Sequence, residues 1–410
     1  MPTGSAARLT ADDFAGVLVP DHMPTNALDY ITVRGFKSIA AIERLPLKAC
    51  NVLIGANGSG KSNFIEVFAF LHLILEGPLR VSLKKYADRA GGAEKVLHFG
   101  SKITKRIDID LGLSAGFGQA EGTRSPSHWQ LALEPTSDDS LSLYAEGVYR
   151  EEEGGVVTVA KVFTPRIGQE QEAGIDQATY AIGPEVWEPI RTLVGGWRIY
   201  HLHDTSSTSP IRKTAKVDDN EFLRPDGSNL AAFLYFLQET HEPSYSLIRR
   251  TVQRVAPFFD DFRLKPRRLK AEDIKLEWKH KSSDQYFDAS SLSDGTLRFI
   301  ALATLLLQPK EYLPSVILVD EPELGLHPYA IEMLTSLVRA ASKNTQVIVS
   351  TQSSLLLDHL DPEDVLVANR VDGGTQITRL ESARLVEWLK DYSLGQLWEK
   401  GEFAGRPTRE

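Results

Sequence analysis

The sequence predicts an α/β protein with a parallel sheet at its core, split by a β-rich and partly helical insertion. Strand-like apolar runs alternate with helical patterns near both ends of the chain, over 47–76 and again over 296–368. Such alternation is typical of a parallel sheet. Between these parts, short alternating runs are separated by clusters of Gly, Pro, Ser and Asp, which indicates antiparallel strands joined by turns.

Composition and charge define the broad class. The 410 residues exceed one ordinary domain, 42% of them are hydrophobic, and the net charge is −9. These values favour a soluble globular protein over one that coats nucleic acid through bulk charge, although a local basic groove is compatible with them. The single cysteine, Cys50, fits a reducing compartment. No secretory signal and no bilayer-length apolar run are evident, so we expect a cytoplasmic protein without membrane association.

Four segments are expected along the chain. Residues 1–27 are rich in small residues, Asp and Pro, and are expected to form a flexible arm. Residues 28–100 form the first part of the core and 101–284 the inserted lid. Residues 285–410 form the second part of the core and a C-terminal helical tail.

Hydrophobic periodicity predicts the elements in order. The first part of the core carries strands over Tyr30–Ile39 and Leu47–Ile54 and a helix over Ser62–Glu76. The lid carries strand-like runs and then a helical stretch, over 107–113, 129–133, 141–149, 156–163 and 229–259. The second part of the core continues with helices over 296–307 and 328–341 and strands over 316–319, 346–350 and 364–368.

The sequence GANGSGKS at 55–62 is a complete phosphate-binding loop between a predicted strand and a predicted helix. Its glycines allow backbone N–H groups to face phosphates, and the helix N-terminus adds positive partial charge. Lys61 is expected to reach the β- and γ-phosphates, and the Ser62 hydroxyl to bind Mg²⁺. The nucleotide is expected to contact Asn57, Gly58, Ser59, Gly60, Lys61, Ser62 and Asn63. A glycine-rich turn without a ligand is the alternative, which the strand–helix context disfavours.

The apolar strand at 316–319 runs directly into Asp320 and Glu321. Acidic residues at the carboxyl end of a parallel strand lie where ligands bind in α/β sheets. Asp320 is expected to support Mg²⁺ through water, and Glu321 to act as the catalytic base that polarises the attacking water.

The segment SSLSDGTLR at 290–298 precedes a predicted helix and resembles the ABC signature motif. In that interpretation Ser293 and Gly295 contact ATP held by a second subunit, through a hydroxyl and a helix N-terminus. The alternative is a plain helix cap formed by Ser293 or Asp294. The position of the segment shortly before the acidic strand favours the signature.

Together with FKSI at 36–39 and DEPELGLHP at 320–328, these motifs resemble the RecF/SMC-like ATPases, which include the ATPase halves of OLD-type nucleases and of phage-defence systems. The resemblance implies an ABC-type P-loop ATPase that forms a homodimer around ATP and Mg²⁺. It also implies control of a separately encoded effector, such as a TOPRIM-like nuclease, in a DNA-directed system. The residues after Gln352 are too few for a nuclease domain of that kind.

Two departures from the ABC pattern are evident. Gln352 stands where most ABC enzymes carry a switch histidine, and an amide can bond to the γ-phosphate but cannot become cationic, so slow hydrolysis is expected. The Q-loop glutamine has no clear match, and Leu97–Ser101 is the candidate segment.

Three other functions are alternatives to the control of an effector. They are a RecF-like DNA-binding repair ATPase, the nucleotide-binding subunit of a transporter, and a scaffold that does not hydrolyse ATP.

Three weaker patterns remain. A basic stretch over 263–281 is either a DNA groove, a site for an acidic partner, or a solvated strand face. His201 and His203 have metal-like spacing but no evident third ligand, so an ordinary pair is favoured over zinc. An aromatic segment over 385–398 is expected to pack on its own core, with a docking surface as the alternative if its tryptophans are exposed.

Overall fold

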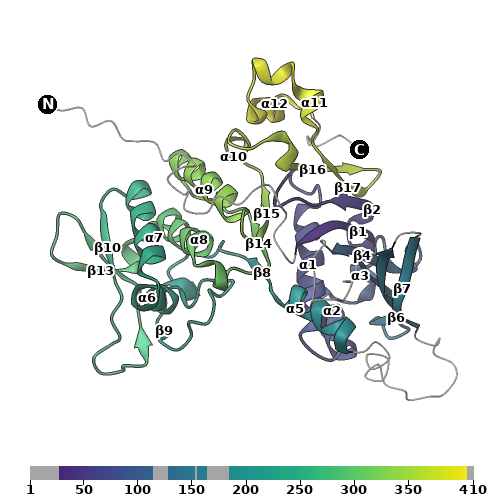
Figure 1. The fold of residues 1–410 in the computed structure, drawn as a ribbon, viewed down its shortest axis with the longest axis horizontal. Coiled ribbons are helices and arrows are strands. Elements are labelled where there is room, and N and C mark those ends of the chain that lie inside the picture. The colour runs from purple at the N-terminus through teal and green to yellow at the C-terminus, as the bar shows by residue number, and fades with distance from the viewer. Residues whose placement is uncertain (1–26, 114–127, 153–154, 164–183, 404–410) are drawn as a thin grey trace.

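The protein is described by a computed structural model over residues 27–113, 128–152, 155–163 and 184–403. Two six-stranded sheets organise it, one antiparallel and one almost entirely parallel. Helices separate the two sheets, and a further helical layer covers the other face of the parallel sheet, which gives the two lobes seen in Figure 1. The predicted α/β architecture with a split parallel core is confirmed.

The antiparallel sheet has the strand order β2-β1-β4-β5-β6-β7. Its strands are β1 (Leu28–Phe36), β2 (Ile39–Pro46), β4 (Ile107–Leu113), β5 (His128–Pro135), β6 (Leu141–Glu152) and β7 (Gly155–Phe163). The alternation of buried and solvated positions in β4 and β5 is the pattern that predicted them. The strand expected over Tyr30–Ile39 is instead a hairpin, because Lys37 takes a positive φ of 49° and turns the chain between β1 and β2.

The central sheet has the order β17-β16-β3-β15-β14-β8, and all neighbours in it are parallel except β16 and β17. Its strands are β3 (Cys50–Ile54), β8 (Trp197–Tyr200), β14 (Val316–Asp320), β15 (Gln346–Thr351), β16 (Val365–Val371) and β17 (Gly374–Arg379). Continuous apolar runs in β3, β14 and β15 are buried on both faces, as parallel strands covered by helices are.

The segment expected as one inserted lid divides among three places. Strands β4 to β7 extend the sheet begun by β1, and β8 completes the edge of the central sheet. The helices α6 (Leu230–Thr240) and α7 (Glu242–Val255) pack on the same core as α8 (Asp294–Leu307) and α9 (Pro328–Ala341). A short strand, β9 (Ala215–Lys216), precedes α6. Further short strands follow α7; they are β10 (Phe259–Arg263), β11 (Asp273–Ile274), β12 (Glu277–His280) and β13 (Tyr286–Asp288).

The layer between the two sheets is formed by α1 (Lys61–Leu75), α2 (Leu79–Ala90), α3 (Ala93–Val96) and α5 (Pro184–Gly195). Phenylalanines at positions 64, 68 and 70 make α1 the centre of this core. Since α1 and α8 belong to different hydrophobic cores on opposite faces of the central sheet, the phosphate loop and the signature helix are separated within one chain (Figure 1).

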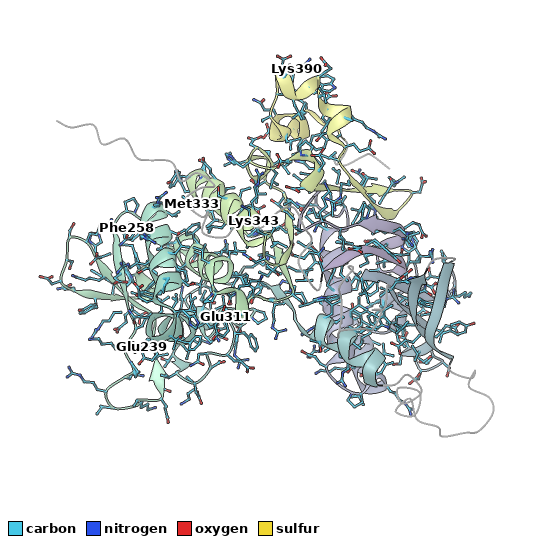
Figure 2. All side chains as sticks on the ribbon, in the orientation of Figure 1. Glu239, Phe258, Glu311, Met333, Lys343 and Lys390 are labelled. Atoms are coloured by element: carbon cyan, nitrogen blue, oxygen red, sulfur yellow. The ribbon has the colours of Figure 1, made fainter. Side chains whose placement is uncertain are left out.

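The C-terminal segment carries α10 (Ser354–Leu357), α11 (Ser382–Leu385) and α12 (Leu394–Lys400), and Figure 2 shows Lys390 at its outer end. Leu394 and Leu397 are buried in the core, as the default interpretation of the tail expects, whereas Trp388 is 44% exposed. Among the described residues, no helix has both the length and the apolar character needed to cross a membrane.

Glu146 on β6 provides a pH test of the antiparallel sheet. Its carboxylate accepts a hydrogen bond of 2.8 Å from Trp129 Nε1, and burial raises the pKa of Glu146 to about 7. An acid with a raised folded-state pKa contributes stability below its unfolded pKa and loses it as the pH rises through the folded value. We therefore expect the free energy of unfolding to fall between about pH 4.5 and pH 7 more steeply in the wild type than in Glu146→Gln.

Urea unfolding followed by tryptophan fluorescence at several pH values measures this difference. Gln376→Ala, on the exposed face of β17, is the control and should keep the wild-type pH profile. Identical pH profiles for Glu146→Gln and the wild type would contradict the assignment.

Candidate nucleotide-binding site

The phosphate loop follows β3 directly and opens α1. Gly58 and Gly60 have φ values of 79° and 100°, in the left-handed region that favours glycine. A Cβ on Gly60 would lie 1.9 Å from Thr375 Oγ1, so this position also has no room for a side chain. Lys61 is 5% exposed, and its Nζ donates to Gly55 O at 2.7 Å and to Ala56 O at 3.1 Å. The loop is therefore closed around its own lysine.

The other expected phosphate-loop residues surround this lysine. Asn57 and Ser62 are exposed at the open side, so the Ser62 hydroxyl is accessible to a ligand. Ser59 is buried, and its Oγ has no hydrogen-bond partner within the described part of the chain. Asn63 Nδ2 donates to Ser38 Oγ at 2.6 Å, which ties the start of α1 to the turn between β1 and β2.

The acidic pair lies at the carboxyl end of β14, next to β15. Asp320 pairs with Ser350 across the two strands, and the Ser350 hydroxyl donates to Asp320 Oδ1. Glu321 leaves the strand with a positive φ of 41°, and its N–H donates to Ser350 O at 2.8 Å. A non-glycine residue in this conformation is strained, and such strain is concentrated at functional sites. The two consecutive carboxylates therefore have different partners, Ser350 for Asp320 and Gln352 for Glu321.

Gln352, which follows β15, contacts the carboxylate of Glu321. Its Nε2 donates to Glu321 Oε1, and its backbone N–H donates to Glu323 Oε1 at 3.1 Å. The residue that replaces the expected switch histidine is thus held beside both glutamates.

Glu323 is a third carboxylate at this edge, which the sequence analysis did not single out. It is buried, and its Oε1 also accepts from Thr351 Oγ1 at 2.5 Å. Burial raises the pKa of Glu323, although these hydrogen bonds act in the opposite direction. The DEPE sequence could have indicated it, but burial of the second glutamate is a property of the folded turn.

Lys61 and these carboxylates interact electrostatically. Burial lowers the pKa of Lys61, whereas the negative charges of Glu321, Asp320 and Glu323 favour its charged form. The fold thus brings Lys61, at the start of the helix after β3, within electrostatic range of Asp320 and Glu321 at the end of β14. The arrangement can hold a polyanion with a divalent cation between lysine and carboxylates.

Ser293 caps α8, as the alternative interpretation of the signature expects. Its Oγ accepts from Thr296 N at 3.2 Å, and the side chain is exposed. Gly295 packs closely on the turn after β14, where an added Cβ would lie 2.1 Å from Gly325 O. The start of α8 therefore lies against the acidic turn, with the Ser293 hydroxyl facing solvent.

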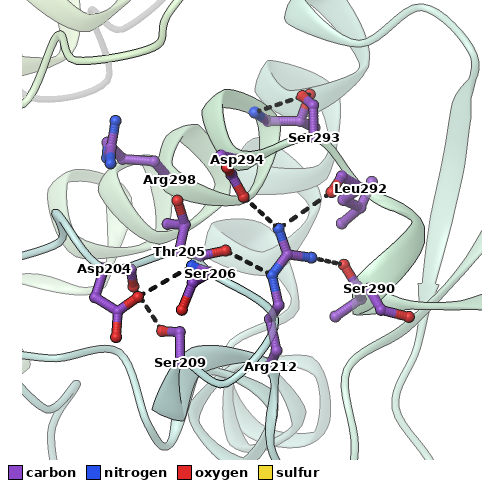
Figure 3. A network of polar contacts seen from close by, with 12 residues as sticks. Asp204, Thr205, Ser206, Ser209, Arg212, Ser290, Leu292, Ser293, Asp294 and Arg298 are labelled. Atoms are coloured by element: carbon purple, nitrogen blue, oxygen red, sulfur yellow. Dashed lines mark hydrogen bonds and ion pairs between the residues drawn. The ribbon is translucent and has the colours of Figure 1, made fainter.

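Two arginines join α8 to the segment that follows β8, and Figure 3 shows the contacts of one of them, Arg212. Arg298 is buried, and it donates to Leu202 O at 2.8 Å and to His203 O at 2.9 Å. Arg212 donates to Thr205 O at 2.8 Å and to the Asp294 carboxylate at 2.7 Å. The signature segment and residues 201–206 are thus fixed to each other.

The segment proposed for the Q-loop, Leu97–Ser101, lies next to β1. His98 Nδ1 contacts Lys37 O at 2.8 Å, and Leu97 forms a bridge with Phe36, so this segment flanks the turn of the first hairpin. The segment that reaches Asp320 is the end of β8, because β8 is the parallel neighbour of β14. Because β8 has only four residues, hydrophobic periodicity does not predict its pairing with β14.

A shallow cavity of about 590 Å³, widely open to solvent, lies between Leu97–Gly100 and Asn63, the residue after the phosphate loop. Its lining includes Lys37, Asn63 and Phe99. Phe99 has a positive φ of 54° and is 57% exposed, so its ring is presented at the surface of this cavity.

A family model described as "AAA domain, putative AbiEii toxin, Type IV TA system" matches residues 50–119 and 165–358, which is more than half of the chain. Old nuclease of Escherichia phage P2 is 23% identical over 400 residues, covering 90% of this chain. The match covers 64% of Old nuclease, so the chain spans less than two-thirds of that protein's length.

Solved structures of SMC heads share the fold. An SMC head bound to the C-terminal winged-helix domain of ScpA aligns with a TM-score of 0.55 at 17% identity, covering 88% of this chain and 99% of the other. An Smc head with an extended coiled coil from Pyrococcus furiosus, bound to the C-terminal domain of ScpA, gives 0.52 at 15% identity, covering 89% and 98%. The predicted ABC-type P-loop ATPase fold is therefore confirmed, as is the resemblance to RecF/SMC/OLD-like proteins.

Proposed function

The chain belongs to the AAA-domain family whose model it matches, and we propose on that basis that two copies of it close around ATP and separate after hydrolysis. The observation that carries this proposal is Lys61, buried in the phosphate loop and facing the carboxylates of Asp320 and Glu321. A buried lysine beside several carboxylates suits a ligand that brings both phosphate charge and a cation.

Lys61 and the amides of the phosphate loop bind the β- and γ-phosphates in this proposal. The positive charge of Lys61, the amide donors and the N-terminus of α1 together compensate the phosphate charge in a partly dry site. The oxygen ligands of Ser62 and Asp320 fit Mg²⁺, which would neutralise charge on the phosphates. Ser62 is exposed and Asp320, at the end of β14, is half-buried, so both oxygens are accessible to an ion.

Glu321 is the proposed general base. Its carboxylate polarises the attacking water, and the hydrogen bond from Gln352 keeps that carboxylate in place. Since Gln352 is neutral at every pH of interest, it cannot supply the positive charge that a histidine would add at the γ-phosphate. We therefore expect slow turnover.

The second half of each site comes from the other copy. Ser293 is exposed at the start of α8, and α8 packs on the face of the central sheet opposite to α1. In an ATP-bound pair, Ser293 and Gly295 of one copy would contact the γ-phosphate held by the other. ATP thereby couples the two subunits, and its hydrolysis releases them.

An ATP-dependent pair of subunits suits a regulatory role. Old nuclease, the relative with 23% identity, is named as a nuclease. We propose that the ATP-dependent pair controls a separately encoded, TOPRIM-like nuclease in a DNA-directed phage-defence system.

The solution mass of Glu321→Gln tests the shared site. Loss of the base should slow hydrolysis about 100-fold or more and trap ATP between two subunits. Light scattering with Mg-ATP should then give twice the monomer mass, and adding Ser293→Arg should restore the monomer. Ser282→Arg, exposed on the turn between β12 and β13, is the matched control and should leave the dimer intact. A monomer that persists with Mg-ATP would refute the proposal.

The cavity beside the phosphate loop is the proposed site of the adenine base. It begins at Asn63, the residue after Ser62, and it presents the ring of Phe99. A base that stacks on an exposed aromatic ring gains about 1–3 kcal/mol.

Phe99→Ala should therefore weaken ATP binding about tenfold while leaving the affinity for inorganic tripolyphosphate unchanged. Isothermal titration of Glu321→Gln protein with both ligands measures this difference. Ile103→Ala, which removes a 69% exposed side chain four residues away, is the control. Equal losses for ATP and tripolyphosphate in Phe99→Ala would place the base elsewhere.

Direct binding of duplex DNA is the second candidate function, and the loop between β10 and β11 favours it. In the basic stretch, Arg263, Lys275 and Lys279 form ion pairs with acidic neighbours, which agrees with a solvated strand face for those positions. The loop itself exposes four cations, Lys265, Arg267, Arg268 and Lys270.

Replacement of these four loop cations by serine should weaken duplex binding and reduce the salt dependence. Each lost phosphate contact lowers the slope of log K against log salt by about 0.9. Fluorescence anisotropy of a labelled duplex at several salt concentrations measures both effects. The control replaces Lys343 and Lys390, which Figure 2 places away from this loop. Salt-independent binding, or none, would exclude this function.

A further inference from the structure

Two histidines that the proposed hydrolysis does not use lie beside Asp320. Strands β8 and β14 are parallel neighbours, and their last pair is Tyr200 with Val319. The next residues are therefore His201 and Asp320, at the same edge of the sheet. One possible ligand atom from each of His201, His203 and Asp320 lies within 4.8 Å of the others. The third ligand that the sequence did not reveal is thus a residue of the acidic strand.

The backbone that carries the two histidines is fixed. His201 N donates to Pro225 O at 3.2 Å, and Leu202 between them is buried. Because side chains alternate along an extended segment, burial of Leu202 leaves both imidazoles on the exposed side. The carbonyls of Leu202 and His203 accept from the buried guanidinium of Arg298. The pair is therefore presented by a rigid segment, and only the imidazole rotamers remain to adjust.

We propose that His201, His203 and Asp320 bind a divalent transition-metal ion, of the class of Mn²⁺, Co²⁺ or Zn²⁺. Imidazole suits these ions, whereas Mg²⁺ prefers oxygen ligands throughout. Two imidazoles and one carboxylate leave positions open for water or a phosphate oxygen. Metal–ligand bonds of about 2.0–2.2 Å place ligand atoms roughly 3–4 Å apart, so closure from the present spacing needs movements of about 1 Å.

The site shares Asp320 with the position proposed for Mg²⁺. Imidazoles on one side of that carboxylate would bias the position toward a transition-metal ion, which would then be the cation accompanying the phosphates. That consequence rests on the proposed ATPase function. Binding of the ion itself does not, since all three ligands belong to the chain.

Cobalt titration of nucleotide-free protein tests the site. Co²⁺ should produce visible d–d absorption bands in the wild type, and these bands should persist in a large excess of Mg²⁺. His201→Ala and His203→Ala should each weaken Co²⁺ binding at least tenfold, measured by the bands and by calorimetry. His280→Ala, on β12, is the control and should bind Co²⁺ as the wild type does.

Thermal melting without metal establishes that the variants are folded, and the use of two separate histidine variants keeps the test decisive if one of them is not. Absence of Co²⁺ bands in the wild type, their loss to Mg²⁺, or equal affinity in the folded histidine variants would overturn the proposal. Because no nucleotide is present, failure here would leave the mass experiment on Glu321→Gln unaffected, and the reverse also holds.

Discussion

The candidate site depends on the parallel register of the neighbouring strands β3, β15, β14 and β8. Asp320 lies opposite Ser350, and Val319 opposite Tyr200, so the carboxyl ends of these strands stop at one edge. A slip of one residue would exchange the two faces of a strand and turn buried apolar groups outward. Because both faces of β14 and β15 pack against helices, that slip would cost much of the core. Packing energy therefore fixes the position of the carboxylates.

Placing charge at this edge has an electrostatic cost that the surrounding groups offset. Lys61 is removed from water, and burial alone would favour its neutral form. The carboxylates of Asp320 and Glu321 favour the charged form, while Glu323 is buried behind them with its own pKa raised. Removing one member would leave a buried charge without its partner, which is more costly than the net value of the pair. The charges at this edge therefore depend on one another.

The features that the sequence predicts are local in the chain, whereas those that it does not predict join residues far apart along it. The phosphate loop and the Asp320–Glu321 pair are local patterns with a strand before them, so spacing alone located them and the fold class. The strand β8 has four residues, too few for a periodic signal, and its neighbour β14 follows only after more than a hundred residues. The proximity of His201 to Asp320 results from that pairing and cannot be predicted from either segment alone. Likewise, the turn at Lys37 carries neither proline nor asparagine, so the alternating pattern predicts one strand where the structure has a hairpin.

The same pairing links the nucleotide edge to the proposed dimer surface. Arg298 on α8 is buried, and burial lowers its pKa, so its guanidinium needs the carbonyls of Leu202 and His203. Separating these groups would leave a buried cation with unsatisfied donors, at a cost of several kcal/mol. The start of α8 and the segment after β8 must therefore move as one body. The proposed cation site and the proposed dimer surface at Ser293 therefore share one rigid support, which Arg298 and Arg212 hold together.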